Sequence, residues 1–81
     1  MRMPRDIGSG DLIKLLKQFG YDVTRQTGSH IRLTTEQNGQ HHITIPNHDP
    51  IKIGTLSAIL ADVATHFKKT KEDLLVELWP R

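Results

Sequence analysis

Residues 28–46 read GSHIRLTTEQNGQHHITIP, and this stretch predicts a β-hairpin. Apolar and polar residues alternate over residues 30–35, which is the period that places successive side chains on opposite faces of a strand. The Asn-Gly pair at 38–39 favours a tight turn, and a second alternating run follows over residues 41–45. Pro46 ends this run because proline has no backbone N–H to donate.

The predicted hairpin has one apolar face and one polar face. Its apolar residues recur at every second position and are expected to face a core: Ile31, Leu33, Ile43 and Ile45. The residues between them are polar and are expected in water: His30, Arg32, Thr34, His42 and Thr44. Antiparallel sheets commonly have one packed face and one solvated face, so the pattern predicts a sheet covered on one side.

The segments before the hairpin predict a helix and a third strand. Residues 21–26 form a strand-like run that ends in a turn-forming cluster at 27–29. Residues 9–20 carry apolar side chains at helical spacing. Ser9 is suited to cap the start of this helix, and Gly20 is suited to end it.

The segments after the hairpin predict two more helices. A loop spans residues 47–53, and a helix with an apolar stripe begins at about Thr55. Thr70 and Asp73 form a capping-box pair, so a final short helix is expected in residues 70–81. The predicted fold is therefore α+β: helix, three-stranded antiparallel sheet, helix and a C-terminal helical extension.

Length and composition indicate one domain. The chain has 81 residues, no cysteine and a formal net charge of +2, so the fold rests on apolar packing without disulfides. We expect residues 1–81 to form a single domain in which residues 1–8 are a loosely docked lead-in. The sequence has no visible leader and no run long enough to cross a bilayer, which predicts a cytoplasmic protein. The free chain is expected to be a monomer or a weak homodimer.

His30 is the first candidate for chemistry, because it opens a strand directly after the Gly28-Ser29 turn. Its position in the alternation places the imidazole on the polar face, beside Arg32. An imidazole can accept or donate a proton near neutral pH, which suits general acid–base catalysis. Arg32 can stabilise the negative charge of a phosphate group bound beside His30. The alternative is a surface histidine without a role.

Two residues in the loop after the hairpin extend this candidate site. His48 is suited to donate a proton to a leaving oxygen or to bind phosphate, and the alternative is a solvated loop histidine. Lys52 precedes the predicted helix start at Gly54-Thr55, where free N–H groups and the helix dipole favour an anion. Gly54 lets a phosphate approach closely. The alternative is a lysine that only flanks a helix cap.

Two further alternatives concern cations. Lys14 and Lys17 lie one turn apart on the polar face of the first helix, where they either contact an RNA backbone or face solvent. A zinc site from His30, His42 and His48 is conceivable, but the chain has no cysteine and no histidine pair at helical spacing. We therefore expect no metal and no cofactor.

The motifs occur in an order that resembles the HicA family of toxin–antitoxin toxins. They are the Gly-Ser-His element at 28–30, Ile-Pro-Asn-His at 45–48, Lys-Ile-Gly-Thr-Leu at 52–56 and Ile-Leu at 59–60. The resemblance covers roughly residues 10–75. It implies a fold like that of double-stranded-RNA-binding domains, an mRNA-cleaving activity and a HicB-type antitoxin as partner.

The resemblance also implies residue roles. The family's catalytic histidine corresponds to His30, and its Lys-x-Gly-Thr-Leu element corresponds to residues 52–56. The residues expected to contact RNA are Lys52, Gly54, Thr55, Lys14, Lys17, Gly28 and Ser29. The expected function is a metal-independent endoribonuclease toxin that an antitoxin restrains. The alternative is a non-catalytic RNA-binding or protein-binding module with the same fold.

Overall fold

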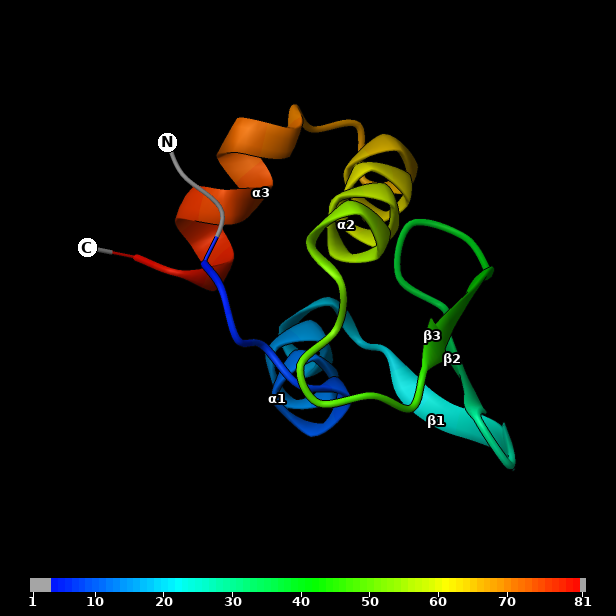
Figure 1. Cartoon of the computed structure of the whole chain (residues 1–81). Coiled ribbons are helices and arrows are strands. Elements are labelled where there is room, and N and C mark those ends of the chain that lie inside the picture. The colour runs from blue at the N-terminus through cyan, green and yellow to red at the C-terminus, as the bar shows by residue number, and fades with distance from the viewer. Residues whose placement is uncertain (1–3, 81) are drawn as a thin grey trace.

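The computed structural model describes residues 4–80 and has the predicted order of elements (Figure 1). The helices and strands are α1 (Ser9–Leu16), a turn of 3-10 helix (Lys17–Phe19), β1 (Asp22–Thr27), β2 (His30–Thr35), β3 (His41–Pro46), α2 (Ile53–His66) and α3 (Lys71–Leu78). β2 has the predicted bounds, and the other elements begin or end within a few residues of the predicted positions. Helix α3 is the predicted C-terminal helical extension.

The three strands form one antiparallel sheet in the order β1-β2-β3. At the start of β2, His30 lies opposite Thr27 of β1 and Pro46 of β3. The register between β1 and β2 shifts between Val23 and Arg25, which marks a bulge in this edge strand. His30 therefore stands at the end of the sheet where β1 and β3 finish and β2 begins.

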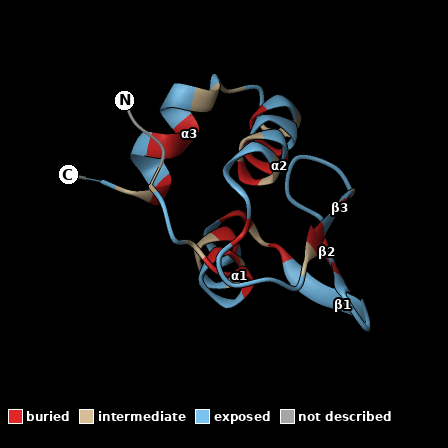
Figure 2. Cartoon of the chain, viewed as in Figure 1, coloured by how far each residue is buried: buried red, intermediate tan, exposed pale blue. Residues whose placement is uncertain are grey.

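Burial follows the predicted alternation, with exposed β1 beside partly buried β2 and β3 (Figure 2). The buried apolar residues of β2 and β3 pack against the buried faces of the helices. The core includes Leu12, Leu16, Leu33, Ile45, Leu56, Leu60, Val63 and Leu74. One sheet face is thus packed and the other is open, which confirms the α+β fold like that of double-stranded-RNA-binding domains. None of the helices within residues 4–80 is both long and apolar enough to cross a membrane.

Two predicted helix boundaries are corrected by the structure. Gly8, not Ser9, is the N-cap of α1, and the Asp11 carboxylate accepts a hydrogen bond from the Gly8 N–H at 3.2 Å. Ser9 is already helical, which frees its hydroxyl for another contact. Helix α2 begins at Ile53, two residues before the predicted start at Thr55.

Two other predicted end signals are borne out. Gly20 adopts φ 79° after the 3-10 turn, a left-handed conformation that favours glycine. Thr70 caps α3, since its hydroxyl accepts from the Asp73 N–H at 3.0 Å. Before α1, the Ile7 carbonyl accepts from the Ile51 N–H at 2.7 Å, so this segment lies against the loop that precedes α2.

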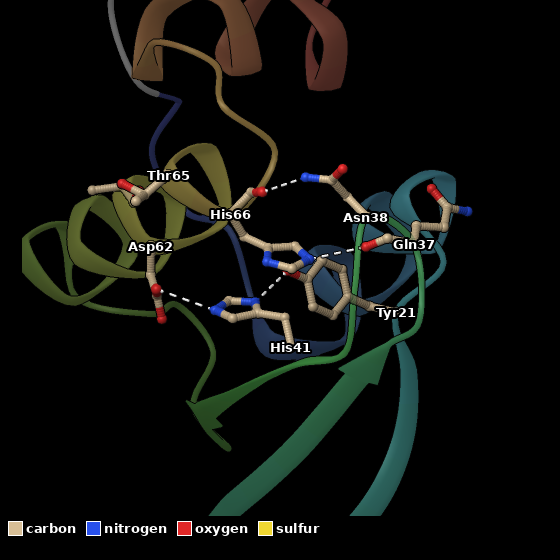
Figure 3. A network of polar contacts seen from close by, with 8 residues as sticks. Tyr21, Gln37, Asn38, His41, Asp62, Thr65 and His66 are labelled. Carbon is tan, nitrogen blue, oxygen red and sulfur yellow. Dashed lines mark hydrogen bonds and ion pairs between the residues drawn. The ribbon is translucent and has the colours of Figure 1, made fainter.

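At the end of the sheet opposite His30, a polar network that the sequence does not predict joins the sheet to α2 (Figure 3). The fully buried Tyr21 has its hydroxyl 2.7 Å from Nδ1 of His41, and His41 Nε2 lies 3.2 Å from the Asp62 carboxylate. His66 stacks on His41 with ring centroids 4.4 Å apart. His66 Nε2 also donates to the Gln37 carbonyl at 2.9 Å, which ties the β2–β3 loop to the end of α2.

Tyr21→Phe tests this network through stability. At neutral pH the change removes the hydroxyl contact to His41 and should lower the free energy of unfolding by about 0.5–1.5 kcal/mol. Burial, together with the Asp62 carboxylate, raises the pKa of Tyr21 above its ordinary value. The unfolded chain therefore loses this proton first, and wild-type stability should fall above pH ~10.

The measurement is urea unfolding of both proteins from neutral to alkaline pH. The difference in free energy of unfolding between wild type and Tyr21→Phe should narrow above pH ~10. Only the wild type has a phenol that ionises more readily in the unfolded chain than in the folded chain. A gap that stays constant across this range would show that Tyr21 ionises as easily in the folded chain as in the unfolded chain.

Candidate functional site

A shallow cleft of about 390 Å³ lies at the sheet end where β2 begins and β3 finishes. Its lining residues are His30, Thr44, Pro46, His48, Lys52 and Thr55. We call this hollow the histidine cleft. It brings together four residues that the sequence predicted as site residues and that lie on three different segments: His30 on β2, His48 in the loop, and Lys52 and Thr55 at the start of α2.

Strand pairing positions His30. The two-residue turn Gly28-Ser29 joins β1 to β2, and Gly28 adopts φ 38°, which suits glycine. His30 is exposed on the open sheet face, as the alternation predicted. Its Nδ1 lies 3.4 Å from the Ser29 hydroxyl, at the outer limit of a hydrogen bond. The backbone of His30 is therefore fixed by strand pairing, and its imidazole is open to a ligand.

Backbone hydrogen bonds position His48. The Asn47 N–H donates to the Ser29 carbonyl at 2.8 Å, which carries the pairing of β2 with β3 one residue beyond Pro46. The His48 N–H then donates to the Pro46 carbonyl at 3.0 Å in a tight turn. The His48 carbonyl accepts from the Ser9 N–H at 2.9 Å. Both backbone polar groups of His48, the N–H and the carbonyl, are therefore hydrogen-bonded, while its imidazole is exposed.

Helix α1 reinforces this loop with side chains. The Ser9 hydroxyl donates to the Asn47 side-chain carbonyl at 3.1 Å, although the two residues are 38 positions apart. A Cβ on Gly8 would lie only 2.7 Å from the Asp49 carboxyl carbon, so the loop approaches the start of α1 closely. Glycine at position 8 allows that approach. The first turn of α1 is therefore a support for the cleft.

The start of α2 supplies the positive side of the cleft. Lys52 is the N-cap residue, and no described side chain caps this end of the helix. The first N–H groups of a helix lack partners within it, and the helix dipole adds partial positive charge there. Lys52 is exposed and Thr55 is half-buried. This end of the cleft suits an anion such as a phosphate.

The other predicted site residues do not line the cleft. Arg32 is exposed two residues along β2, opposite Thr44. Gly28 and Ser29 form the turn beside His30. A Cβ on Gly54 would meet no atom within 4 Å, so space beside the first turn of α2 is open. Lys14 and Lys17 are both exposed near the C-terminal end of α1.

The remaining histidines and the tyrosine have other environments. His42 Nδ1 lies 2.7 Å from the Thr34 hydroxyl, which in turn lies 2.8 Å from the Thr24 hydroxyl, so His42 belongs to a polar row across the open face. His41 is half-buried. Tyr21 is fully buried, so its ring is not open to stack on a nucleobase. Within residues 4–80 no three histidine or acidic side chains are grouped as metal ligands.

Sequence reasoning missed the contributions of Ser9, Asn47 and Pro46 to this site. The predicted tight turn at 38–39 would place residue 47 opposite residue 30, whereas the strands are joined by a loop over residues 36–40 and Pro46 lies opposite His30. Ser9 and Asn47 gave no local signal. Their contact joins segments far apart in the chain, and a serine before a helix also fits a cap.

The fold and the cleft together define a class of protein: a small α+β domain with an open sheet face and a cationic, histidine-bearing cleft at one end of the sheet. The sequence model of the family described as "HicA toxin of bacterial toxin-antitoxin" matches residues 9–64. The protein therefore belongs to the HicA toxin family, the toxins of bacterial toxin–antitoxin systems. No curated protein and no solved structure matched the chain. The matched region runs from the first residue of α1 almost to the end of α2 and contains every residue of the histidine cleft.

The Ser9–Asn47 contact predicts a specific coupling. Ser9→Ala and Asn47→Ala each remove the same hydrogen bond and should each lower the free energy of unfolding by about 1 kcal/mol. The free energy of unfolding of the double variant should lie within about 0.5 kcal/mol of that of the less stable single variant. The second change removes no further hydrogen bond. Urea unfolding of the four proteins measures this cycle. Fully additive losses would mean that the two side chains act independently.

Proposed function

We propose that this toxin is an endoribonuclease that cleaves mRNA in the histidine cleft, with His30 as its general base. The observation that carries the proposal is the convergence of His30, His48 and Lys52 in one cleft at the uncapped start of α2. Imidazoles can move protons near neutral pH, and the lysine and helix amides suit a phosphate between them. The cytoplasm is where such a toxin meets mRNA, and a HicB-type antitoxin restrains it.

In the proposed reaction the nucleophile belongs to the RNA. His30 removes the proton from a 2′-hydroxyl, and that oxygen attacks the adjacent phosphorus. The bond from phosphorus to the 5′-oxygen of the next nucleotide breaks, and His48 donates a proton to this leaving oxygen. The products are a 2′,3′-cyclic phosphate and a 5′-hydroxyl end. Atoms and charge balance without a further reactant.

Lys52 and the first amides of α2 are suited to the phosphate oxygens, where negative charge grows in the transition state. This arrangement favours a metal-independent reaction, because the residues lining the cleft offer imidazole, ammonium and hydroxyl groups but no carboxylate. Magnesium sites of nucleases are built mainly from carboxylates. Asp49, the acid of the loop, packs instead against Gly8.

Residues outside the cleft are suited to hold the rest of the strand. Arg32 lies on the same open face as His30 and can bind a phosphate next to the scissile one. The turn at 28–29 and the open side of Gly54 leave room for the backbone of the RNA. Lys14 and Lys17 add positive charge on α1. These contacts are independent of base identity, so they supply affinity without sequence preference.

The first prediction here separates His30 from the other histidine on the open sheet face. Expression of the wild-type chain without antitoxin should arrest growth and deplete mRNA, and His30→Ala should abolish both effects. In a purified reaction the rate of cleavage should fall by about 10²–10⁴, the usual contribution of general acid–base catalysis. RNA cleavage and culture growth are the two measurements.

His42→Ala is the matched control, because His42 is also exposed on the open face but does not line the cleft. It should remain toxic and cleave RNA at a rate close to that of the wild type. Undiminished toxicity of a folded His30→Ala protein would remove His30 from the mechanism. A wild-type protein that binds RNA without cutting it would favour the non-catalytic module.

The second prediction concerns the ends of the products. Cleavage should leave a 2′,3′-cyclic phosphate or its 3′-phosphate hydrolysis product, together with a 5′-hydroxyl. It should proceed in EDTA and fail on RNA that carries a 2′-deoxy or 2′-O-methyl sugar at the cut site. Mapping both ends with and without chelator decides the question. Products with 5′-phosphates, formed only with divalent metal, would contradict the role given to His30. The proposed endoribonuclease activity would still stand.

A further inference from the structure

A second hollow of about 300 Å³ shares Lys52 with the histidine cleft but is lined by neither histidine. Its lining residues are Arg5, Asp6, Pro50, Ile51, Lys52 and Ile53. Lys52 lines both this hollow and the histidine cleft, so the two hollows are neighbours across a single side chain. A strand whose phosphate binds Lys52 in the cleft therefore has its next nucleotide within reach of the second hollow.

The wall of the second hollow is built by contacts between distant segments. The Ile51 N–H donates to the Ile7 carbonyl at 2.7 Å, and the Ile51 side chain is buried in the core. This bond places residues 5 and 6 beside the loop that leads into α2. The hollow is thus formed between the segment before α1 and the start of α2, with its floor anchored in the core.

The chemistry of this lining favours a nucleobase over a second phosphate. Ile53 leaves 49% of its surface exposed in the first turn of α2, and Pro50 and Ile51 add apolar wall. Asp6 contributes a carboxylate, which would repel a phosphate. Arg5 and Lys52 offset that charge, and a guanidinium can stack on an aromatic ring. A flat, uncharged ring with a polar edge satisfies all of these groups.

We propose that the second hollow is a base subsite, which binds the nucleobase next to the scissile phosphate of the RNA. The inference rests on the proposed nuclease function and adds a specificity determinant to it. An ionised carboxylate only accepts hydrogen bonds, so Asp6 selects a base with an exocyclic amino group: adenine, cytosine or guanine. Uracil has no amino group, and its one free donor, N3–H, lies between two carbonyl oxygens that the carboxylate would repel.

The test uses the His30→Ala protein, which keeps the RNA intact, and a short fluorescent RNA that spans a cut site mapped with the wild type. Each nucleotide in turn is replaced by an abasic residue, and binding is measured by anisotropy. One abasic position beside the cut should weaken binding by about five- to tenfold, at the lower end of the effect of losing one stacked base.

Adding Ile53→Ser should remove this abasic penalty, because the side chain that contacts the base is gone. The matched control is Val76→Ser, which truncates an apolar residue that is 50% exposed on α3 and lines neither hollow. The control should keep the full penalty. Exchanging the base at that position for uracil should weaken binding to the parent protein, and Asp6→Asn should abolish the discrimination.

The outcomes distinguish the base subsite from the nuclease itself. If the RNA binds but no abasic position matters, or if Ile53→Ser and Val76→Ser keep the same penalty, the base subsite is overturned and the nuclease stands. If uracil binds as well as cytosine, the role of Asp6 is overturned. A folded protein that neither binds nor cuts RNA overturns the proposed function and the base subsite together.

Discussion

The register between β2 and β3 is the constraint on which the rest of the structure depends. It places His30 opposite Pro46, and the Asn47 N–H then bonds to the Ser29 carbonyl one step beyond the strands. A slip of one residue would turn the imidazole of His30 into the core and bring an isoleucine into water. Burial of the apolar face of the hairpin therefore selects the register, and the register in turn selects the position of the cleft.

The cleft is a composite of segments that the fold supports separately. Its exposed side chains contribute little to the core, and the contacts that position them lie underneath: Ser9 against Asn47, and Gly8 against Asp49. Changes in the exposed imidazoles should therefore alter chemistry with little loss of stability, whereas changes in the supports should alter both. This separation allows a small domain to carry the histidine cleft on its surface.

The five histidines divide according to the two ends of the sheet. His41 and His66 lie at one end, in the network with Tyr21 and Asp62 that ties the sheet to α2. His30 and His48 lie at the opposite end, exposed in the cleft. His42 lies between them on the open face, paired with Thr34. One residue type thus serves as structural hydrogen-bond partner where it is half-buried and as candidate proton carrier where it is open to solvent.

Local pattern was sufficient for much of this protein. Alternation over residues 30–35 determined the bounds of β2, the exposure of His30 and the fold class, because periods of two and 3.6 residues are properties of the chain itself. Only the tertiary structure decided that His48 and Lys52 reach His30, that Ser9 supports the cleft instead of capping α1, and that Tyr21 is buried. These facts depend on contacts between segments distant in sequence, which form only when the sheet and helices pack, and no local period encodes them.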